Sequence, residues 1–179
     1  DEARAGRWVS GTFGWWWRYE DGTYPTSTQL RIDGAIYRFN ARGYMVTGWV
    51  HEDGEWFYYG PSGGQASGWV RVHGTWYYLD PISGAMASGW MKVQGAWYYL
   101  SSSGAMRTGW VRDGSSWYYL TSSGSLSTGW QRVGSSWYYL SPDGGAMVTG
   151  WLKDGGSWFY LSSSGAMVTG ARWIDGTRY

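Results

Sequence analysis

The stretch Thr108-Gly-Trp-Val-Arg-Asp-Gly-Ser-Ser-Trp-Tyr-Tyr-Leu120 decides the fold, because the chain repeats its pattern. A Gly-Trp pair recurs at intervals of 20 or 21 residues. A second Trp follows each first Trp after seven residues, and an aromatic pair follows the second Trp. A fixed period of this length is the signature of a repeat architecture, so it outweighs any local signal.

Six full copies of this pattern cover residues 48–167. The first Trp of each copy is Trp49, Trp69, Trp90, Trp110, Trp130 and Trp151. The second Trp is Trp56, Trp76, Trp97, Trp117, Trp137 and Trp158. Each copy ends in a Ser/Gly-rich loop that usually reads Ser-Gly-Ala-Met. We divide the chain into an N-terminal linker with atypical capping repeats (1–47), six full repeats (48–169) and a degenerate or truncated terminal repeat (170–179).

Each copy is predicted to form a β-hairpin. The first strand starts at the Gly-Trp pair, and the second is Trp-Tyr-Tyr-Leu, which has high strand propensity. A Gly-containing turn such as His73-Gly74 or Asp113-Gly114 joins them, because Gly supplies the positive φ of tight turns. No segment has the apolar period of a helix. A lone hairpin is marginal in water. We therefore predict an all-β solenoid, a superhelix of stacked hairpins of about 20 residues each.

The parity of the strands predicts which side chains share a face. With a two-residue turn at His73 and Gly74, Trp69 faces Tyr78 and Arg71 faces Trp76 across the hairpin, and opposed residues share a face. Both Trps of a copy therefore lie on one face with the second Tyr of the pair. The opposite face carries Val70, Val72, Tyr77 and Leu79.

The Trp face has two interpretations, a packed core or an aromatic cage. The face of an aromatic ring attracts a diffuse cation such as a quaternary ammonium group, and Trp is the best partner. A core tolerates Leu or Phe in place of Trp if volume is kept. Here all twelve positions are Trp, whereas the first residue of the aromatic pair varies between Phe and Tyr. The pattern therefore favours a cage.

The copies resemble choline-binding (cell-wall-binding) repeats. The stretch Gly14-Trp-Trp-Trp-Arg-Tyr-Glu-Asp-Gly-Thr-Tyr-Pro25, followed by Ile32-Asp-Gly and Gly43-Tyr-Met45, is similar to the start of the choline-binding modules of autolysins. The resemblance covers about residues 14–179. It implies that choline is held between consecutive copies by the two Trps of one hairpin, an aromatic residue of the next, and often a loop Met.

Carried onto this chain, the resemblance implies that the third ring of each pocket is the second Trp of the next copy. The pockets would be Trp49 and Trp56 with Trp76, Trp69 and Trp76 with Trp97, Trp90 and Trp97 with Trp117, Trp110 and Trp117 with Trp137, and Trp130 and Trp137 with Trp158. Trp151 completes the set of choline-binding candidates. The loop Met is present at Met86, Met106, Met147 and Met167, and is replaced by Gln65 and Leu126. Whether the second Tyr of each pair lines or supports the pocket stays open for Tyr58, Tyr78, Tyr99, Tyr119, Tyr139 and Tyr160.

The end copies depart from the pattern. Gln29 and Ile36 stand at the Trp positions of the first, partial copy, so no cage is expected there. Ala171 and Arg178 replace both Trps of the last copy, as expected of a cap or of a truncated copy. Either packing or an added binding surface would account for Trp15-Trp16-Trp17, and the segment before Gly14 is either a linker or a first strand.

Charged residues outside the Trps have simpler interpretations. A basic residue follows two positions after most first Trps, and it is either solvated or meets the phosphate attached to choline. These residues are Arg71, Lys92, Arg112, Arg132 and Lys153. Four acids beside glycines are expected to be turn residues, namely Asp33, Asp113, Asp154 and Asp175. The two histidines, His51 and His73, occupy unlike positions and are expected at the surface.

Composition excludes several classes of function. The formal net charge is +1, so no bulk field draws the chain to nucleic acid or an anionic membrane. With no Cys and only two His, we expect no disulfide, no metal site and no cofactor. No apolar run reaches the roughly 20 residues that span a bilayer, so no membrane insertion is expected. No signal peptide is visible, and a first residue of Asp1 suggests a mature or excised fragment.

These observations predict a non-catalytic binding module with no catalytic residues. It would recognise choline residues of bacterial cell-wall (lipo)teichoic acids and anchor a secreted protein to the cell surface, and a catalytic domain could exist elsewhere in the full protein. Alternatives are a glucan- or other carbohydrate-binding repeat, a toxin-type repeat for host glycans, and a structural repeat that self-associates through its end copies. Competition between free choline and dextran discriminates the first two ligands.

Overall fold

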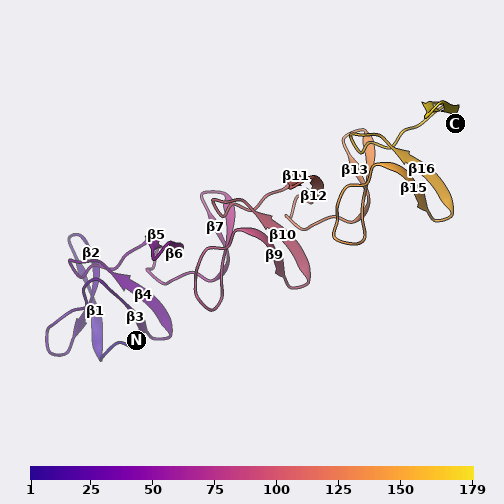
Figure 1. Cartoon of the computed structure of the whole chain (residues 1–179). Helices are drawn as coiled ribbons and strands as arrows, with labels where there is room; N and C mark the ends of the chain where they lie inside the picture. The colour runs from indigo at the N-terminus through magenta and orange to yellow at the C-terminus, as the bar shows by residue number, and fades with distance from the viewer. The chain divides into compact units, whose positions relative to one another are not determined.

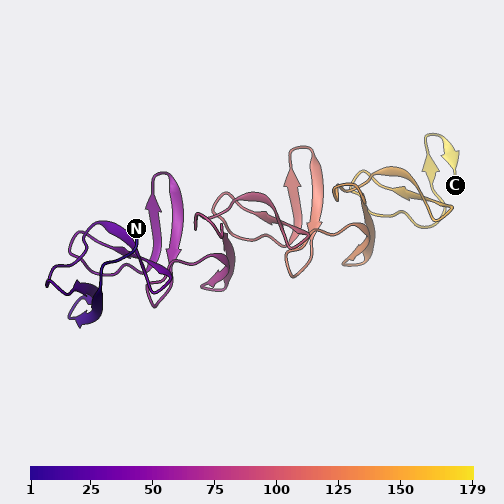
Figure 2. The ribbon, with the colours of Figure 1, turned by 90° about the horizontal axis from the view of Figure 1, so that it is seen from below.

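The computed structural model describes residues 1–179 and contains only strands, turns and loops (Figure 1). Eighteen strands pair into nine antiparallel hairpins, each a separate two-stranded sheet (Figure 2). The strands are β1 (Gly6–Gly11), β2 (Gly14–Tyr19), β3 (Thr28–Ile32), β4 (Ala35–Phe39), β5 (Gly48–Glu52), β6 (Glu55–Tyr59), β7 (Gly68–Val72), β8 (Thr75–Leu79), β9 (Gly89–Val93), β10 (Ala96–Leu100), β11 (Gly109–Asp113), β12 (Ser116–Leu120), β13 (Gly129–Val133), β14 (Ser136–Leu140), β15 (Gly150–Asp154), β16 (Ser157–Leu161), β17 (Trp173–Ile174) and β18 (Thr177–Arg178). The predicted all-β stack of hairpins is confirmed.

The chain divides into two units, which are described separately. The first holds residues 1–89 with 102–105, and the second holds residues 90–101 with 106–179. Hairpins β1–β2 to β7–β8 belong to the first unit, and hairpins β11–β12 to β17–β18 belong to the second. No helix has the length and hydrophobicity that a membrane crossing needs.

Two-residue turns close the hairpins. His73 and Gly74 join β7 to β8 with φ values of 47° and 86°, and positive φ at both central positions is the type I′ geometry that matches strand twist. In β11–β12 the turn is Gly114-Ser115, one residue later than the Asp113-Gly114 turn that the sequence suggested. Asp113 is therefore the last residue of β11 and not a turn residue.

The register confirms the predicted parity of the strands. Trp69 pairs with Tyr78, Arg71 with Trp76, and Val70 with Tyr77. The same register recurs in β11–β12, where Trp110 pairs with Tyr119 and Val111 with Tyr118. The two Trps of each copy therefore project from one face of their hairpin.

The core lies at the end of each second strand. The last residue there is fully buried, with a side-chain exposure of 0% at Leu120. The equivalent residues Phe39, Tyr59, Leu79, Leu100, Leu140 and Leu161 are buried to the same degree or nearly so. Burying one Leu side chain contributes about 1.5–3 kcal/mol. Within each unit these buried side chains form the apolar interior of the hairpins.

Within each unit, backbone hydrogen bonds tie a loop to the hairpin of the preceding copy. The Met86 N–H, in the loop after β8, donates to the carbonyl of Trp56 at 2.7 Å. In the second unit the Met147 N–H donates to the carbonyl of Trp117 at 2.7 Å. The second Trp of a copy is thus fixed at its backbone by the next copy.

The segment before Gly14 forms a strand, β1, and not a linker. It pairs with β2 so that Trp8 faces Trp17 and Ser10 faces Trp15. Trp17 is buried in a cluster with Leu30, Ile32 and Phe39. The N-terminal region therefore begins with a packed hairpin of its own.

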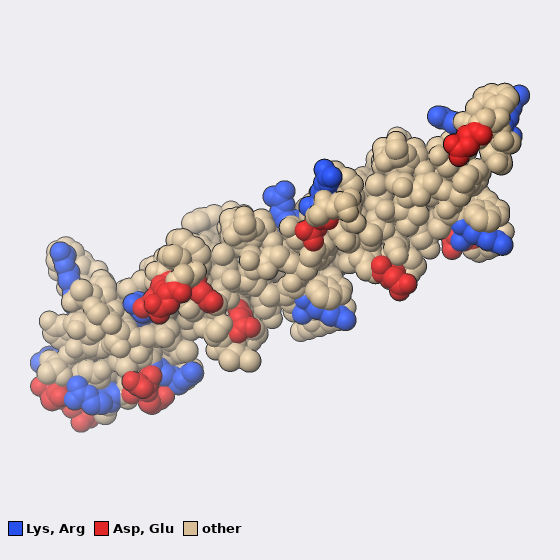
Figure 3. Space-filling model, in the orientation of Figure 1, with Lys and Arg blue, Asp and Glu red and all other residues tan.

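Charge is sparse and mixed in sign (Figure 3). Three ion pairs form, all in the first unit: Arg4–Asp21, Arg31–Glu2 and Arg38–Glu52. On the face drawn, neither sign gathers into a large patch. Surface pairs of this kind contribute at most about 1 kcal/mol each, so the apolar stack dominates stability.

Candidate functional site

A hollow lined by aromatic rings recurs along the chain. In the first unit Trp49, Trp56, Tyr77 and Met86 line a cavity of about 350 Å³ with Ser102 and Ser103 at its rim. The two indole rings meet at 84° with centroids 6.5 Å apart, so they form two walls at right angles. We call such a hollow a Trp hollow and name it by its first Trp.

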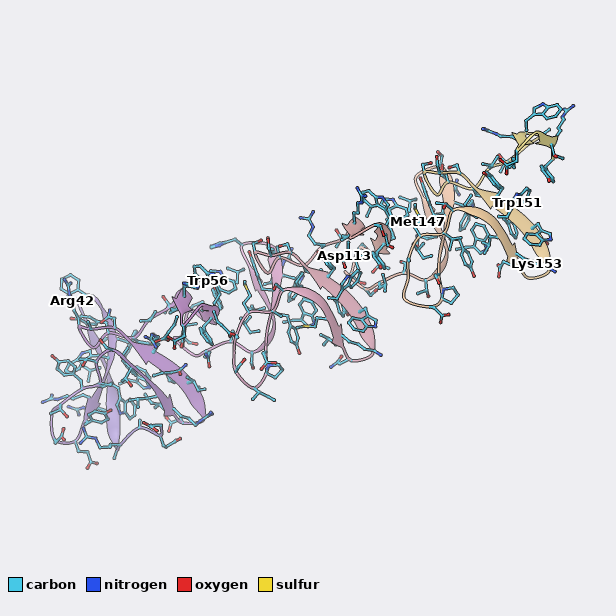
Figure 4. The ribbon with its side chains drawn as sticks, viewed as in Figure 1. Arg42, Trp56, Asp113, Met147, Trp151 and Lys153 are labelled. Carbon is cyan, nitrogen blue, oxygen red and sulfur yellow. The ribbon has the colours of Figure 1, made fainter.

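The second unit holds two further Trp hollows. Trp110, Trp117, Tyr138 and Met147 line a cavity of about 340 Å³. The indoles of Trp110 and Trp117 meet at 87°, and Met147 is labelled in Figure 4. The Trp90 hollow has about 390 Å³ and is lined by Trp90, Trp97, Tyr118 and Leu126, with Asp113 and Gly144. A Leu at the Met position therefore does not prevent the hollow from forming.

The third ring differs from the expected one. Trp49 lies 4.8 Å from Tyr77, the first residue of the next aromatic pair, and Trp76 is not in this hollow. The reason is parity, because Tyr77 points to the face opposite Trp76 and that opposite face meets the preceding hairpin. The same correction replaces Trp117 by Tyr118, Trp137 by Tyr138, and Trp158 by Phe159.

The second Tyr of each pair supports the first Trp. Tyr58 lies 5.0 Å from Trp49, and Tyr119 lies 5.1 Å from Trp110. Neither lines the hollow of its copy. The first Trp is therefore held edge-on between a Tyr of its own hairpin and an aromatic ring of the next. The same contact recurs at Tyr78, Tyr99, Tyr139 and Tyr160.

Exposure separates the cage interpretation from the core interpretation. Trp117 keeps 41% of its surface exposed, whereas Leu120 on the opposite face is at 0%. The second Trps Trp56, Trp76, Trp97 and Trp137 are exposed to a similar degree. Large apolar rings left in water at regular positions are typical of a binding surface and not of a core.

An additional Trp hollow opens at the N-terminal hairpin, and the sequence analysis missed it. Trp8, Trp15, Tyr37 and Met45 line about 360 Å³ with Pro61 and Ser62 at the rim. Trp8 lies 4.8 Å from Tyr37, which reproduces the spacing of Trp49 and Tyr77. The signal was present, because Trp8 and Trp15 are also seven residues apart. Arg7 in place of the usual Gly concealed it.

A glycine of the following loop lets the Met reach the hollow. Gly104 has φ 79°, and a Cβ at this position would clash with the Met86 side chain. Gly63 stands in the same relation to Met45, and Gly165 to Met147. The Ser-Gly-Ala-Met loop thus serves two copies, since its Gly admits the Met of the preceding loop.

Hairpin β3–β4 lacks the rings. Gln29 and Ile36 stand at the two Trp positions, and the Gln29 Nε2 donates to the Tyr59 hydroxyl at 2.9 Å. Burial raises the pKa of the Tyr59 phenol. Gln65 of the following loop stands where other copies have the Met, and its N–H donates to the Ile36 carbonyl at 2.8 Å. A polar contact therefore replaces the aromatic walls.

At the other end Trp151 lies 4.9 Å from Tyr179, and Trp158 is 63% exposed. Ala171 and Arg178 occupy the Trp positions of the last copy. The expected site of Trp69 and Trp76 with Trp97 draws on residues of both units and stays a prediction, as does the choline-binding role expected of Met106. The contacts of Trp130 and Trp137 match those in the hollows. The ring centroids of Trp130 and Phe159 are 4.9 Å apart, and the Met167 N–H donates to the Trp137 carbonyl.

The recurrent base lies beside the second Trp and outside the hollow. Lys153, labelled in Figure 4, has its Nζ 5.7 Å from the Trp158 ring centroid. Lys92 and Arg71 hold equivalent positions beside Trp97 and Trp76, at 5.9 and 6.0 Å. These distances are at the outer limit of a cation–π contact. In the first full copy His51 takes this position, 4.8 Å from Trp56, and is exposed as expected.

Two of the four acids were assigned wrongly as turn residues. Asp33 and Asp175 do sit in turns, with φ of 50° and 48°. Asp113 and Asp154 instead end strands β11 and β15. Their side chains accept hydrogen bonds from Trp90 and Trp130, both at 3.0 Å. The offset of the turn by one residue moves these carboxylates from the hairpin tip to the Trp of the preceding copy.

A family model described as choline-binding repeat matches residues 26–67, 53–89, 87–128 and 127–173. The chain belongs to the choline-binding repeat family. It is therefore a module of choline-binding repeats, as its resemblance to that family implied. The N-terminal hairpin that carries the Trp8 hollow lies outside the matched residues.

Solved structures support the same conclusion. CbpJ from Streptococcus pneumoniae TIGR4 is 37% identical over 91% of this chain and 59% of its own, with a TM-score of 0.81. Choline-binding protein F from Streptococcus pneumoniae, solved with a peptidoglycan analogue, is 37% identical over 90% of this chain and 58% of its own, with a TM-score of 0.79. The pneumococcal cell-wall endolysin from phage Cp-1, complexed with choline, is 36% identical over 71% of this chain and 38% of its own, with a TM-score of 0.53.

The chain spans less than three fifths of the length of CbpJ and of choline-binding protein F. Comparison with curated proteins finds no match. The family membership therefore describes the repeats of this chain and does not extend to the activity of a longer protein that contains them.

Proposed function

We propose that this chain binds choline groups in its Trp hollows and anchors a protein to a choline-bearing bacterial surface. The observation that carries the proposal is the pair of half-exposed indoles at right angles, closed by a third ring and a loop side chain. Such a hollow offers several π faces to one compact cation, at about 0.5–2 kcal/mol per contact. The sites proposed are those named by Trp8, Trp49, Trp90, Trp110 and Trp130.

The geometry of the rings favours choline over a sugar. A pyranose stacks on a flat, open ring face, whereas the two indoles of a hollow stand at 84° to 87° and leave no flat platform. A trimethylammonium group is nearly spherical and contacts perpendicular walls equally well. Glucan binding is therefore the weaker alternative.

The binding partner we propose is a wall polymer that carries phosphocholine, such as a teichoic acid. Several hollows on one chain bind such a polymer more tightly than they bind free choline, because each further contact is intramolecular. Lys92 lies beside Trp97 of the Trp90 hollow, where its charge can meet the phosphate next to choline. The chain would act as a secreted, non-catalytic anchor, and any catalytic domain would lie elsewhere in the protein.

Affinity chromatography tests this function. The chain should bind a choline-substituted resin and elute with free choline, while dextran at the same concentration and salt at matched ionic strength should leave it bound. Elution by dextran would assign the hollows to sugars instead. Light scattering with and without choline tests the remaining alternative, in which the end copies mediate self-association.

A further inference from the structure

Two of the five sites carry a carboxylate, and the others do not. Asp113, labelled in Figure 4, lines the Trp90 hollow. Its Oδ2 accepts a hydrogen bond from the Trp90 indole N–H at 3.0 Å. Asp154 holds the same position for Trp130, also at 3.0 Å. The equivalent strand positions are Val72 for the Trp49 hollow and Val133 for the Trp110 hollow. The acid therefore divides the sites into two kinds.

The carboxylate is not needed to place the Trp ring. Trp90 lies 5.0 Å from Tyr99 and 4.9 Å from Tyr118. Trp110, which has no acid partner, lies 5.1 Å from Tyr119 and 4.8 Å from Tyr138. The corresponding centroid distances around Trp90 and Trp110 differ by only 0.1 Å. A purely structural role for Asp113 therefore leaves its presence unexplained.

A carboxylate at the wall changes which cation fits best. The quaternary ammonium group of choline has no N–H, so this group offers Asp113 charge attraction but no hydrogen bond. A protonated tertiary or secondary amine also has an N–H, which can donate to the carboxylate as a charge-assisted hydrogen bond. Oδ2 already accepts from the indole, and Oδ1 remains available on a side chain that lines the hollow.

We propose that the Trp90 and Trp130 sites form an acidic class that prefers protonated amines bearing an N–H, whereas the Trp49 and Trp110 hollows prefer the quaternary group. This inference rests on the proposed choline-binding function and adds a second ligand class to it. The chain would then recognise incompletely methylated amino alcohols at the acidic sites as well as choline at all of them.

The test follows the indole N–H signals of Trp49, Trp90, Trp110 and Trp130 by NMR in the full chain. Choline chloride and N,N-dimethylethanolamine hydrochloride are titrated at neutral pH and equal ionic strength. The ratio of the two dissociation constants at each Trp is the readout. We expect it to favour the tertiary amine at Trp90 and Trp130 by about two- to fivefold relative to Trp110, the range of a partly exposed charge pair.

Three variants sharpen the test. Asp113→Asn keeps an acceptor for the indole but removes the charge, so the ratio at Trp90 should fall to that of Trp110. Val133→Asp should raise the ratio at Trp110, since it places a carboxylate at the equivalent strand position. Asp33→Asn makes the same change of net charge in the turn of β3–β4 and should alter no ratio.

Equal ratios at all four indoles, or an unchanged ratio in Asp113→Asn, would overturn the acidic class while leaving choline binding intact. If no indole signal moves with either amine, choline binding itself fails and this inference fails with it. The two results are distinguishable because the first still shows saturable shifts with choline.

Discussion

Hairpins β3–β4 and β11–β12 have the same strand register but different side chains on their Trp face. Both pair with the same register, from Thr28 opposite Phe39 and from Gly109 opposite Leu120. Both end in a fully buried side chain. In both, the carbonyl of the residue at the second Trp position accepts a hydrogen bond from the next loop, at 2.8 Å for Ile36 and 2.7 Å for Trp117.

The two hairpins differ in the rings on their exposed face. Hairpin β3–β4 stacks with Gln29 and Ile36 where β11–β12 has Trp110 and Trp117. The stack therefore needs the buried row and the backbone bonds, and it does not need the Trps. This separates the residues that fold the chain from those that we expect to bind choline, and the predictions below test that separation.

The largest effect is expected for Leu120→Ser. Leu120 is fully buried, so the change removes its apolar contacts and places a hydroxyl in the core. We expect a loss of about 3–5 kcal/mol in the free energy of unfolding. Denaturant unfolding followed by circular dichroism measures it. Choline sites should be lost only in step with the folded fraction, and a folded variant that has lost a site would contradict the separation.

Trp117→Leu should do the reverse. It keeps an apolar side chain on an exposed face, so we expect less than about 1.5 kcal/mol of destabilisation. The lost π face should weaken the Trp110 hollow about tenfold, in line with one cation–π contact of 1–2 kcal/mol. Choline titration followed by the indole N–H signals measures this site by site.

The same experiment tests the corrected third ring. Because Tyr118 and not Trp117 closes the Trp90 hollow, Trp117→Leu should leave that hollow intact. Tyr118→Leu should weaken the Trp90 hollow and spare the Trp110 hollow. Loss of both sites in Trp117→Leu would restore the shared-Trp arrangement that the family resemblance implied.

The features predicted correctly from the sequence are those that depend on a single hairpin, whereas the contacts between neighbouring hairpins were missed. Period and parity lie within a single hairpin, so the two-Trp face and the buried Leu120 followed from spacing alone. The third ring was assigned wrongly because it depends on which face of the next hairpin turns toward the hollow. That relation is set by the buried row and the loop bonds, which no spacing within a copy encodes.

Local exceptions account for the other differences. Asp113 was read as a turn residue because it precedes Gly114, but the turn runs through Gly114-Ser115. The Trp8 hollow was missed because its copy lacks the Gly-Trp pair and carries Trp16-Trp17 where other copies have Tyr or Phe. A search for the seven-residue Trp spacing alone would have found it.

A smaller effect is expected for Gly104→Ala. Ala at φ 79° costs about 1–2 kcal/mol in backbone strain, and its Cβ would displace the Met86 side chain. We expect this displacement to weaken choline binding at Trp49 about two- to threefold, the loss of part of one side-chain contact. Gly34→Ala is the matched control, because Gly34 has φ 83° but no neighbour near the added Cβ. It should lose similar stability with no change at any site, and equal binding losses in both variants would argue against the role of Met86.

The smallest effect is expected in two loops where a side-chain oxygen accepts hydrogen bonds from backbone N–H groups, an arrangement that we call a loop cap. Asn40 Oδ1 accepts hydrogen bonds from the N–H groups of Arg42 and Tyr44, and Asp80 Oδ1 accepts from those of Ile82 and Ser83. The bonds from Ser83 and Ile82 lower the pKa of Asp80 below its ordinary value of 3.8. The Asp80 contribution to stability is therefore complete above pH 3.8 and is lost as the pH falls through the lowered pKa.

The Asn40 cap has no charge to lose, so the two loops should diverge only in acid. Asp80→Asn should convert one cap into the other, and its melting temperature should match that of the wild type more closely at about pH 2 than at pH 6. Because Asp80 lies at the surface and is partly exposed, solvent screens the effect, and we expect a shift of no more than a degree or two. A difference between wild type and variant that grows as the pH falls would show that the charge of Asp80 does not stabilise its loop.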